Sequence, residues 1–174
     1  MEEIKMKIEL YPLEKAVIDG ASIFLDMNQS DVEQMIGKGQ FVRDRYYYYN
    51  GELAISYDIN GRVNFVEFLG GVDGKLKPII YGVSAFDTDA VEIYELLKQH
   101  NGNDIVDAER GYSYSFLNIS VGIYRESILE SVAEMIEEAD GFGNPMSEEE
   151  IEYESKKANH WATIGIGVKG YYRA

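Results

Sequence analysis

Few residues in this chain could carry acid–base or metal chemistry. There are two histidines, His100 and His160, and no cysteine. A histidine-based catalytic or metal site needs several groups that converge on one point. His100 instead stands at the predicted end of a helix, where a cation complements the helix dipole, and His160 precedes a predicted strand. We therefore expect structural or surface roles for both histidines, and no metal or cofactor.

Three carboxylates could together bind a hard cation: Asp104, Asp107 and Glu109. Their spacing is not that of an EF-hand loop, and the glycine that such a loop needs at its turn is missing. The sequence has no Gly-x-Ser-x-Gly motif, so a nucleophile elbow has no support. We expect solvated carboxylates here rather than a metal site or a catalytic site.

The glycines between Gly165 and Gly170 have a spacing that could be mistaken for a phosphate loop. A phosphate loop leads into a helix whose N-terminal amides face the phosphate. The sequence ends four residues after Gly170, and we expect no helix to follow. We expect these glycines to lie in a strand, where they let another backbone or an aromatic ring come close.

The densest chemical signal is a run of carboxylates near the C-terminal end. The segment from Glu126 to Glu154 contains no Lys or Arg, and the run from Glu148 to Glu154 is its densest part. Its carboxylates are either the solvated face of a helix or a docking site for a Lys/Arg-rich surface, where charge would speed association more than it adds affinity. Both interpretations stay open at this point.

Aromatic residues supply candidate anchors for such a partner. Four consecutive tyrosines, Tyr46 to Tyr49, alternate across a predicted strand, so one pair should be buried and the other exposed. Exposed Tyr and Trp often contribute most of the affinity at protein interfaces. The candidate partner-binding residues are Glu134, Glu137, Glu138, Glu148, Glu149, Glu150, Glu152, Tyr153, Tyr46, Tyr48 and Trp161.

Composition limits the classes of partner. The chain has 174 residues, is 45% hydrophobic and 27% charged, and carries a net charge of -15. An acidic surface repels nucleic acid and anionic membranes, so we expect neither as a partner. The first residues, Met1 to Lys7, contain no apolar run that could act as a signal peptide, and no stretch approaches the ~18 apolar residues of a membrane span. We expect a cytoplasmic protein.

Local patterns predict the elements that position these residues. Helices are expected over 28–36 and 87–100, and over 126–139 and 147–158 within the acidic segment. A three-stranded meander is expected over 41–69, because Asn50-Gly51 and Asn60-Gly61 are strong hairpin turns. A short strand is expected over 5–9. Longer strands are expected over 112–124, with a bulge near Phe116-Leu117, and over 161–172, paired with each other around an insertion at 126–158.

These elements predict an α+β fold, with a mainly antiparallel sheet and helices packed on one face. A helix followed by strands occurs twice, once in residues 1–74 and once in 75–174, which we expect to form one compact unit. The order fits a tandem repeat, and it equally fits two unrelated helices packed on one sheet.

One segment resembles a known module. Phe24 to Gly37, with Met27, Val32 and Glu33 inside it, resembles the helix of small α-β-β modules found in the BamE outer-membrane family and, doubled, in β-lactamase inhibitor protein. The segment departs from that pattern at Asp26, where glycine is usual, and the chain lacks the lipoprotein signal and lipidated cysteine of BamE. The resemblance implies a fold that serves protein binding rather than catalysis, and no envelope role.

The whole chain also resembles the small acidic immunity proteins of bacterial polymorphic toxins in charge, in expected location and in lacking a catalytic motif. That resemblance implies a non-enzymatic module that occludes a basic toxin, and it assigns no residue roles. Two other classes stay open: a hydrolase that uses carboxylates alone, and an oligomeric structural protein whose strands pair between subunits. Whether the chain is a monomer or a dimer is also open.

Overall fold

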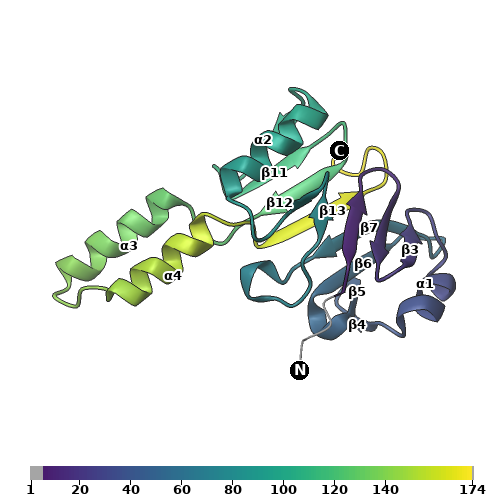
Figure 1. Cartoon of the computed structure of the whole chain (residues 1–174), viewed down its shortest axis with the longest axis horizontal. Coiled ribbons are helices and arrows are strands. Elements are labelled where there is room, and N and C mark those ends of the chain that lie inside the picture. Colours follow the sequence, from purple (N-terminus) through teal and green to yellow (C-terminus); the bar gives the residue numbers. More distant parts are fainter. Residues whose placement is uncertain (1–5, 174) are drawn as a thin grey trace.

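The computed structural model describes residues 6–173 as an α+β fold built on two sheets (Figure 1). The large sheet contains β4 (Gln40–Val42), β5 (Arg45–Tyr48), β6 (Leu53–Tyr57), β7 (Val63–Phe68), β10 (Ile105–Val106), β11 (Ser113–Phe116), β12 (Val121–Tyr124) and β13 (Thr163–Gly167). Its strand order is β10-β11-β12-β13-β7-β6-β5-β4, and every neighbouring pair is antiparallel. The predicted α+β class with mainly antiparallel pairing is therefore confirmed.

The small sheet contains β1 (Ile8–Tyr11), β2 (Lys15–Ile18), β3 (Ala21–Phe24), β8 (Ile79–Ile80) and β9 (Val83–Ser84). Its order is β3-β2-β1-β8-β9, with one parallel pair, β1 and β8. The helices are α1 (Gln29–Ile36), α2 (Ala90–Asn101), α3 (Leu129–Gly141) and α4 (Glu148–Ala158), and two short 3₁₀ turns are η1 (Tyr49–Gly51) and η2 (Gly71–Asp73). Residues Met1 to Lys5 lie outside the described residues. They include the start of the strand predicted over 5–9 and most of the segment, Met1 to Lys7, for which no signal peptide is expected.

The two halves of the chain share one topology. Apart from the short η1, the order of elements from β2 to β7 is two strands, a helix and four strands. The same order recurs from β8 to β13 once α3 and α4, which lie between β12 and β13, are set aside. In the large sheet the last strands of the two halves, β7 and β13, are antiparallel neighbours at the centre. In the small sheet β2 and β8 flank β1 and run in opposite directions. Both strand orders therefore read the same from either edge, as an approximate twofold relation requires.

One backbone hydrogen bond recurs in both halves and supports this relation. The first amide of α1, that of Gln29, donates to the carbonyl of Gly61 (3.0 Å). The first amide of α2, that of Ala90, donates to the carbonyl of Asn159 (2.7 Å). Each helix thus begins on the segment that enters the last strand of its own half, and one otherwise orphaned amide of each helix is satisfied. By this equivalence the tight β6–β7 turn corresponds to the long β12–β13 connection that contains α3 and α4.

A single core joins the two sheets with α1 and α2. Alternate residues of the central strands face it: Val66 and Phe68 from β7, and Ile164 and Ile166 from β13. The facing pattern follows from the period of two in a strand. The other face of β13 carries Gly165 and Gly167, against which lie the rings of Phe65 and Tyr171. The expectation that these glycines admit aromatic rings is confirmed.

Several predicted elements were wrong in detail. The segment 112–124 is no bulged strand but a hairpin, β11–β12, with its turn at 117–120. The closing strand ends at Gly167, because the chain then turns back and lays Tyr172 over Gly122. It is central, and it pairs with β12 as predicted. Strands β2 and β3 and the added edge strand β4 were not predicted from the sequence. Two apolar residues of the predicted helices, Met35 of α1 and Val91 of α2, are exposed.

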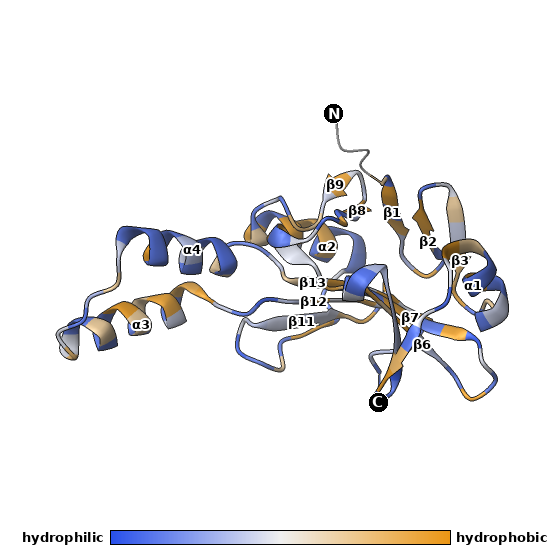
Figure 2. Cartoon of the chain, turned by 90° about the horizontal axis from the view of Figure 1, so that it is seen from below, coloured by the Kyte–Doolittle hydropathy of each residue, from blue (hydrophilic) through white to orange (hydrophobic). Residues whose placement is uncertain are grey.

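The insertion folds as a helical hairpin that stands away from the sheets. Helices α3 and α4 pack against each other, and Figures 1 and 2 show them projecting beyond the end of the large sheet. We call residues 126–160 the arm and the rest of the described chain the body. Across residues 6–173, no helix has the length and apolar character needed to cross a membrane.

Candidate protein-binding arm

Local sequence signals build the two helices of the arm. The hydroxyl of Ser147 accepts a hydrogen bond from the amide of Glu150 (3.1 Å) and caps α4. Three glutamates fill the first turn of α4, and Lys156 and Lys157 fill its last turn, an arrangement that complements the helix dipole at both ends. The apolar stripe of α3 is centred on Val132, which is buried. These features confirm the predicted helices at 126–139 and 147–158 to within about three residues.

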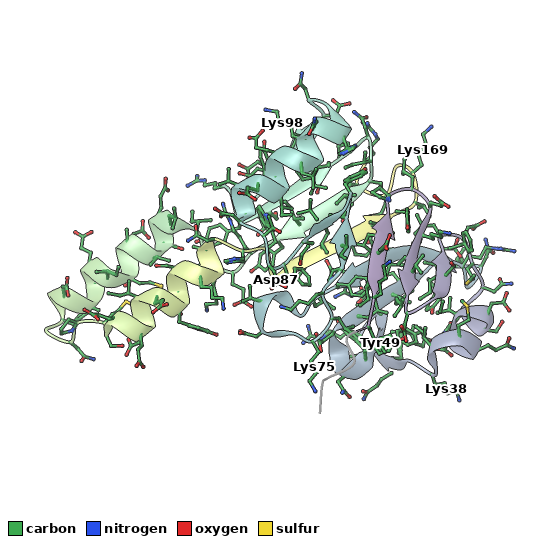
Figure 3. All side chains as sticks on the ribbon, viewed as in Figure 1. Lys38, Tyr49, Lys75, Asp87, Lys98 and Lys169 are labelled. Atoms are coloured by element: carbon green, nitrogen blue, oxygen red, sulfur yellow. The ribbon has the colours of Figure 1, made fainter. Side chains whose placement is uncertain are left out.

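Negative charge is concentrated on the arm. It holds eleven acidic residues and two lysines, a net charge of -9 out of -15 for the whole chain. All seven predicted binding carboxylates on the arm are exposed: Glu134, Glu137, Glu138, Glu148, Glu149, Glu150 and Glu152. The lysines labelled in Figure 3, namely Lys38, Lys75, Lys98 and Lys169, all belong to the body. The arm is thus the most acidic part of the molecule and the part that projects farthest from it.

Apolar side chains remain exposed beside these carboxylates. Relative exposures are 60% for Leu129, 39% for Met135, 88% for Phe142 and 51% for Tyr153. Figure 2 shows α3 as the more hydrophobic and α4 as the more hydrophilic helix of the pair. Two helices alone can cover only the centre of the α3 stripe, so its flanks and the tip at Phe142 stay in contact with water. The predicted anchor Tyr153 lies among these exposed residues.

The root of the arm is fixed by one arginine. Arg125 donates from Nη1 to the carbonyl of Ala158 (2.9 Å) and from Nε to the carbonyl of Gly111 (2.9 Å). Its guanidinium lies 4.8 Å from the centre of the Trp161 ring, a cation–π distance. Burial lowers the pKa of Arg125 below its usual value. The residue therefore joins the strand entering the arm to the helix leaving it.

Trp161 is not a surface anchor. Its side chain is 1% exposed, its indole N–H donates to the carbonyl of Ala90 (2.9 Å), and the Tyr114 ring packs edge-on against it. The prediction that Trp161 contacts a partner is wrong, because its side chain is buried against α2, a helix that is distant in the sequence. Its role in the structure is to hold the arm root to α2.

Of the two tyrosines predicted to bind a partner, Tyr48 is buried and Tyr46 is half-buried. Tyr48 is 4% exposed, and its hydroxyl donates to Glu33 Oε2 (2.8 Å) and lies 2.7 Å from the hydroxyl of Tyr57. Burial, followed by these hydrogen bonds, raises the pKa of Tyr48. Tyr46 is half-buried between the rings of Phe41 and Tyr57. Tyr48 is therefore a packed residue of the body, and neither tyrosine belongs to the arm.

The predicted site residues consequently fall into separate regions. The seven glutamates and Tyr153 share the arm, while β5, which carries Tyr46 and Tyr48, lies well away from the arm in Figure 1. The structure brings together the acidic residues and leaves the aromatic pair out of that group.

The other chemically capable residues have structural contacts. His100 stacks on Tyr81 with ring centres 3.6 Å apart, and His160 Nδ1 hydrogen-bonds to the carbonyl of Lys156 (2.7 Å). Asp107 accepts from the amide of Gly111, and Asp104 lies 3.5 Å from Arg173. Between Met6 and Arg173, the structure groups no three His, Cys, Asp or Glu side chains in a way that could hold a metal ion.

A cleft at the arm root was not predicted from the sequence. It has a volume of about 160 Å³ and lies between η2 and the arm. Its walls are Leu69, Gly70, Gly71, Val72, Asp73, Glu126, Tyr153, Lys157, His160, Trp161 and Ala162. Gly71 has φ +59, and a Cβ there would lie 3.3 Å from the Cα of Ala162, so glycine lets the loop lie close to the strand entry. In the sequence, the two adjacent glycines Gly70 and Gly71 were the one signal that could have indicated this close approach.

No protein-family model, no curated protein and no solved structure matches the chain.

Proposed function

We propose that this chain is a non-enzymatic, cytoplasmic protein-binding module that acts as an inhibitor, most concretely as an immunity protein of a basic toxin. The observation that carries the proposal is the arm itself, a helical hairpin with a net charge of -9 and exposed apolar side chains. It makes few contacts with its own body, and its surface is therefore open to a partner.

Charge selects the kind of partner. Two copies of the arm would repel each other, and nucleic acid would be repelled as well. A cationic protein surface would be attracted over distances of about a Debye length, ~8–10 Å at physiological salt. The carboxylates would speed the encounter, and the exposed Leu129, Phe142 and Tyr153 would contribute apolar contact once water is excluded.

Inhibition would follow from occlusion. A toxin that acts on nucleic acid needs a cationic surface for its substrate, and an acidic arm competes for the same surface. The arm is held at its root by Arg125 and Trp161, so less conformational entropy would be lost on binding than for a disordered acidic tail. The body would then act as the scaffold that presents a preformed helical hairpin.

The test is affinity capture from the source organism's lysate at about 50 mM and about 500 mM salt. The arm-reversed variant carries Glu134→Lys, Glu138→Lys and Glu152→Lys. The body-reversed control carries Glu14→Lys, Glu95→Lys and Glu109→Lys, which changes the net charge equally at exposed positions outside the arm. We expect a basic protein to be captured by the unaltered chain and the control, to be lost with the arm-reversed variant, and to be inhibited by the unaltered chain. Equal capture by all three forms, or an uninhibited partner, contradicts the proposal.

A further inference from the structure

The cleft at the arm root has the features of a site for one cationic side chain. It is the place where the arm meets the body, so its walls come from segments more than fifty residues apart, η2 on one side and α4 on the other. Its volume of about 160 Å³ is that of roughly five water molecules, which suits the end of a long side chain rather than a whole cofactor.

An internal cation already shows how the cleft binds positive charge. Lys157 Nζ lies 5.0 Å from the centre of the Tyr153 ring, 3.6 Å from Glu126 Oε2 and 3.4 Å from Glu154 Oε2. The Tyr153 ring thus turns a face toward a cation, and two carboxylates share one amine. The pKa of Lys157 is raised: burial acts to lower it, but the hydrogen bond to Glu154 and the charges of Glu154 and Glu126 outweigh that.

Carboxylates and part of an aromatic ring remain accessible to a ligand in the cleft. Glu126 is 60% exposed and shares Lys157 with Glu154, and the exposed Asp73 of η2 also lines the cleft. Tyr153 is 51% exposed, so part of its ring stays accessible. Two further cations lie near the cleft and are already engaged. Lys77 is held by the carbonyls of Gly71 and Val72 on the η2 loop and by Asp87 (3.1 Å). The Arg125 guanidinium lies against the Trp161 ring and donates to the carbonyls of Ala158 and Gly111. Besides His160, the charged residues that line the cleft are therefore two carboxylates, Glu126 and Asp73, and one amine, Lys157.

We propose that this cleft binds a guanidinium group, presented as a surface arginine of the basic partner. A planar guanidinium can stack on Tyr153 while its N–H groups reach Glu126 and Asp73, which a compact ammonium cannot do at once. The cleft would make the arginine a specific anchor, where the rest of the arm supplies only diffuse attraction. The assignment rests on the proposed function for the source of the arginine, but the site itself can be tested without any partner.

The experiment is an NMR titration of the full-length ¹⁵N-labelled chain with Nα-acetyl-arginine amide at low salt. We expect saturable shifts at the amides of 69–73 and 153–162 and at the Trp161 indole, with a dissociation constant on the order of millimolar. Nα-acetyl-citrulline amide has nearly the same shape without the charge and should bind at least about tenfold more weakly. The lysine derivative should bind at least about threefold more weakly than the arginine derivative.

Three variants locate the binding. Tyr153→Ala and Glu126→Gln should each weaken binding of the arginine derivative by about threefold or more. Tyr153→Phe keeps the aromatic ring and should bind the derivative as tightly as the unaltered chain does. Glu149→Gln, on the exposed first turn of α4, should leave it unchanged. The assignment is overturned by equal binding of arginine and citrulline derivatives, by equal binding of arginine and lysine derivatives, or by unsaturable shifts spread along the acidic face. Such a result would leave the capture experiment above unaffected, so the two proposals can fail separately.

Discussion

Arg125 Nη1 donates a 2.9 Å hydrogen bond to the carbonyl of Ala158, the last residue of α4. The bond joins the two chain segments that cross between the body and the arm. It also places a cation at the carbonyl end of a helix, where the dipole favours positive charge. The arm is held at its root, by Arg125 and by the Trp161–Ala90 hydrogen bond, rather than along its length.

Replacing Arg125 should loosen this root. Arg125→Ala removes two hydrogen bonds to carbonyls and the contact with Trp161, so we expect a loss of about 2–3 kcal/mol in the free energy of unfolding. Amide hydrogen exchange should accelerate first at Ala158 to Ala162. Urea denaturation and exchange NMR measure both effects. Lys98→Ala, at an exposed position on α2, is the control and should change neither; unchanged exchange at the root in Arg125→Ala would contradict the clamp.

The cap of α4 should matter locally. Ser147→Ala leaves the Glu150 amide without its acceptor, at an expected cost of about 1 kcal/mol to the helix. Ser147→Asp should retain the cap. Hydrogen exchange at Glu149 to Ile151 should rise in the alanine variant alone, with the body amides unaffected. Faster exchange throughout β7 and β13 would show instead that the arm and the sheets unfold as one unit.

Two glycines predict opposite effects of an added methyl group: Gly122, which lies under the ring of Tyr172, and Gly141, which lies in α3. A Cβ at Gly122 would overlap the ring of Tyr172, so Gly122→Ala should destabilise the fold by about 1–3 kcal/mol. At Gly141, in the last turn of α3, a Cβ meets nothing within 4 Å, and Gly141→Ala should stabilise α3 by up to about 1 kcal/mol. Thermal denaturation compares the two. Adding Tyr172→Ala to Gly122→Ala should relieve most of the overlap, and an unrelieved loss would place the strain elsewhere.

Buried tyrosines should limit stability at high pH. Burial raises the pKa of Tyr57 to about 12, despite the opposing hydrogen bond from Tyr48, and it raises the pKa of Tyr48 as well. Both hydroxyls stay neutral in the folded state at pH values where an unfolded tyrosine, with a pKa of about 10, has ionised. Stability should therefore be complete below pH about 10 and fall as pH rises toward 12. The difference in tyrosinate absorbance between this chain and a Tyr48→Phe, Tyr57→Phe variant separates these two rings from the exposed tyrosines. That difference should appear only together with unfolding, and its appearance in the folded protein would contradict these shifts.

The features readable from the sequence were those set by neighbouring residues. Ser147 followed by glutamates, and Asn60-Gly61 between alternating strands, act within a few positions, and both elements lie where predicted. The strands β2 and β3 were missed although Asp19-Gly20, with φ +48 and +87, forms their turn. That Asp-Gly signal is local and was available.

The features that could not be predicted depend on distant residues. The β11–β12 turn is held by Asn101, whose side-chain oxygen accepts from the amides of Asn118 and Ile119. Trp161 is buried because Ala90, 71 positions earlier, accepts its indole hydrogen bond. Neither partner is evident from the residues around the turn or the ring. Dependence on distant residues also separates the two parts of the candidate site. The acidic arm is one continuous segment and was predicted from the sequence, whereas the cleft is formed by two distant segments and was not predicted.

Photo-crosslinking in the native cell tests the central claim most directly. Benzoyl-phenylalanine placed at Phe142, which is 88% exposed at the arm tip, is compared with the same residue at Phe41, which is 58% exposed on the edge strand β4. Both substitutions keep an aromatic ring on an exposed site, so each chain should remain folded. We expect a crosslink from position 142 to a basic protein, its loss in the arm-reversed variant, and no crosslink from position 41. A crosslink from position 41 alone, whether to another protein or to a second copy of this chain, would contradict it.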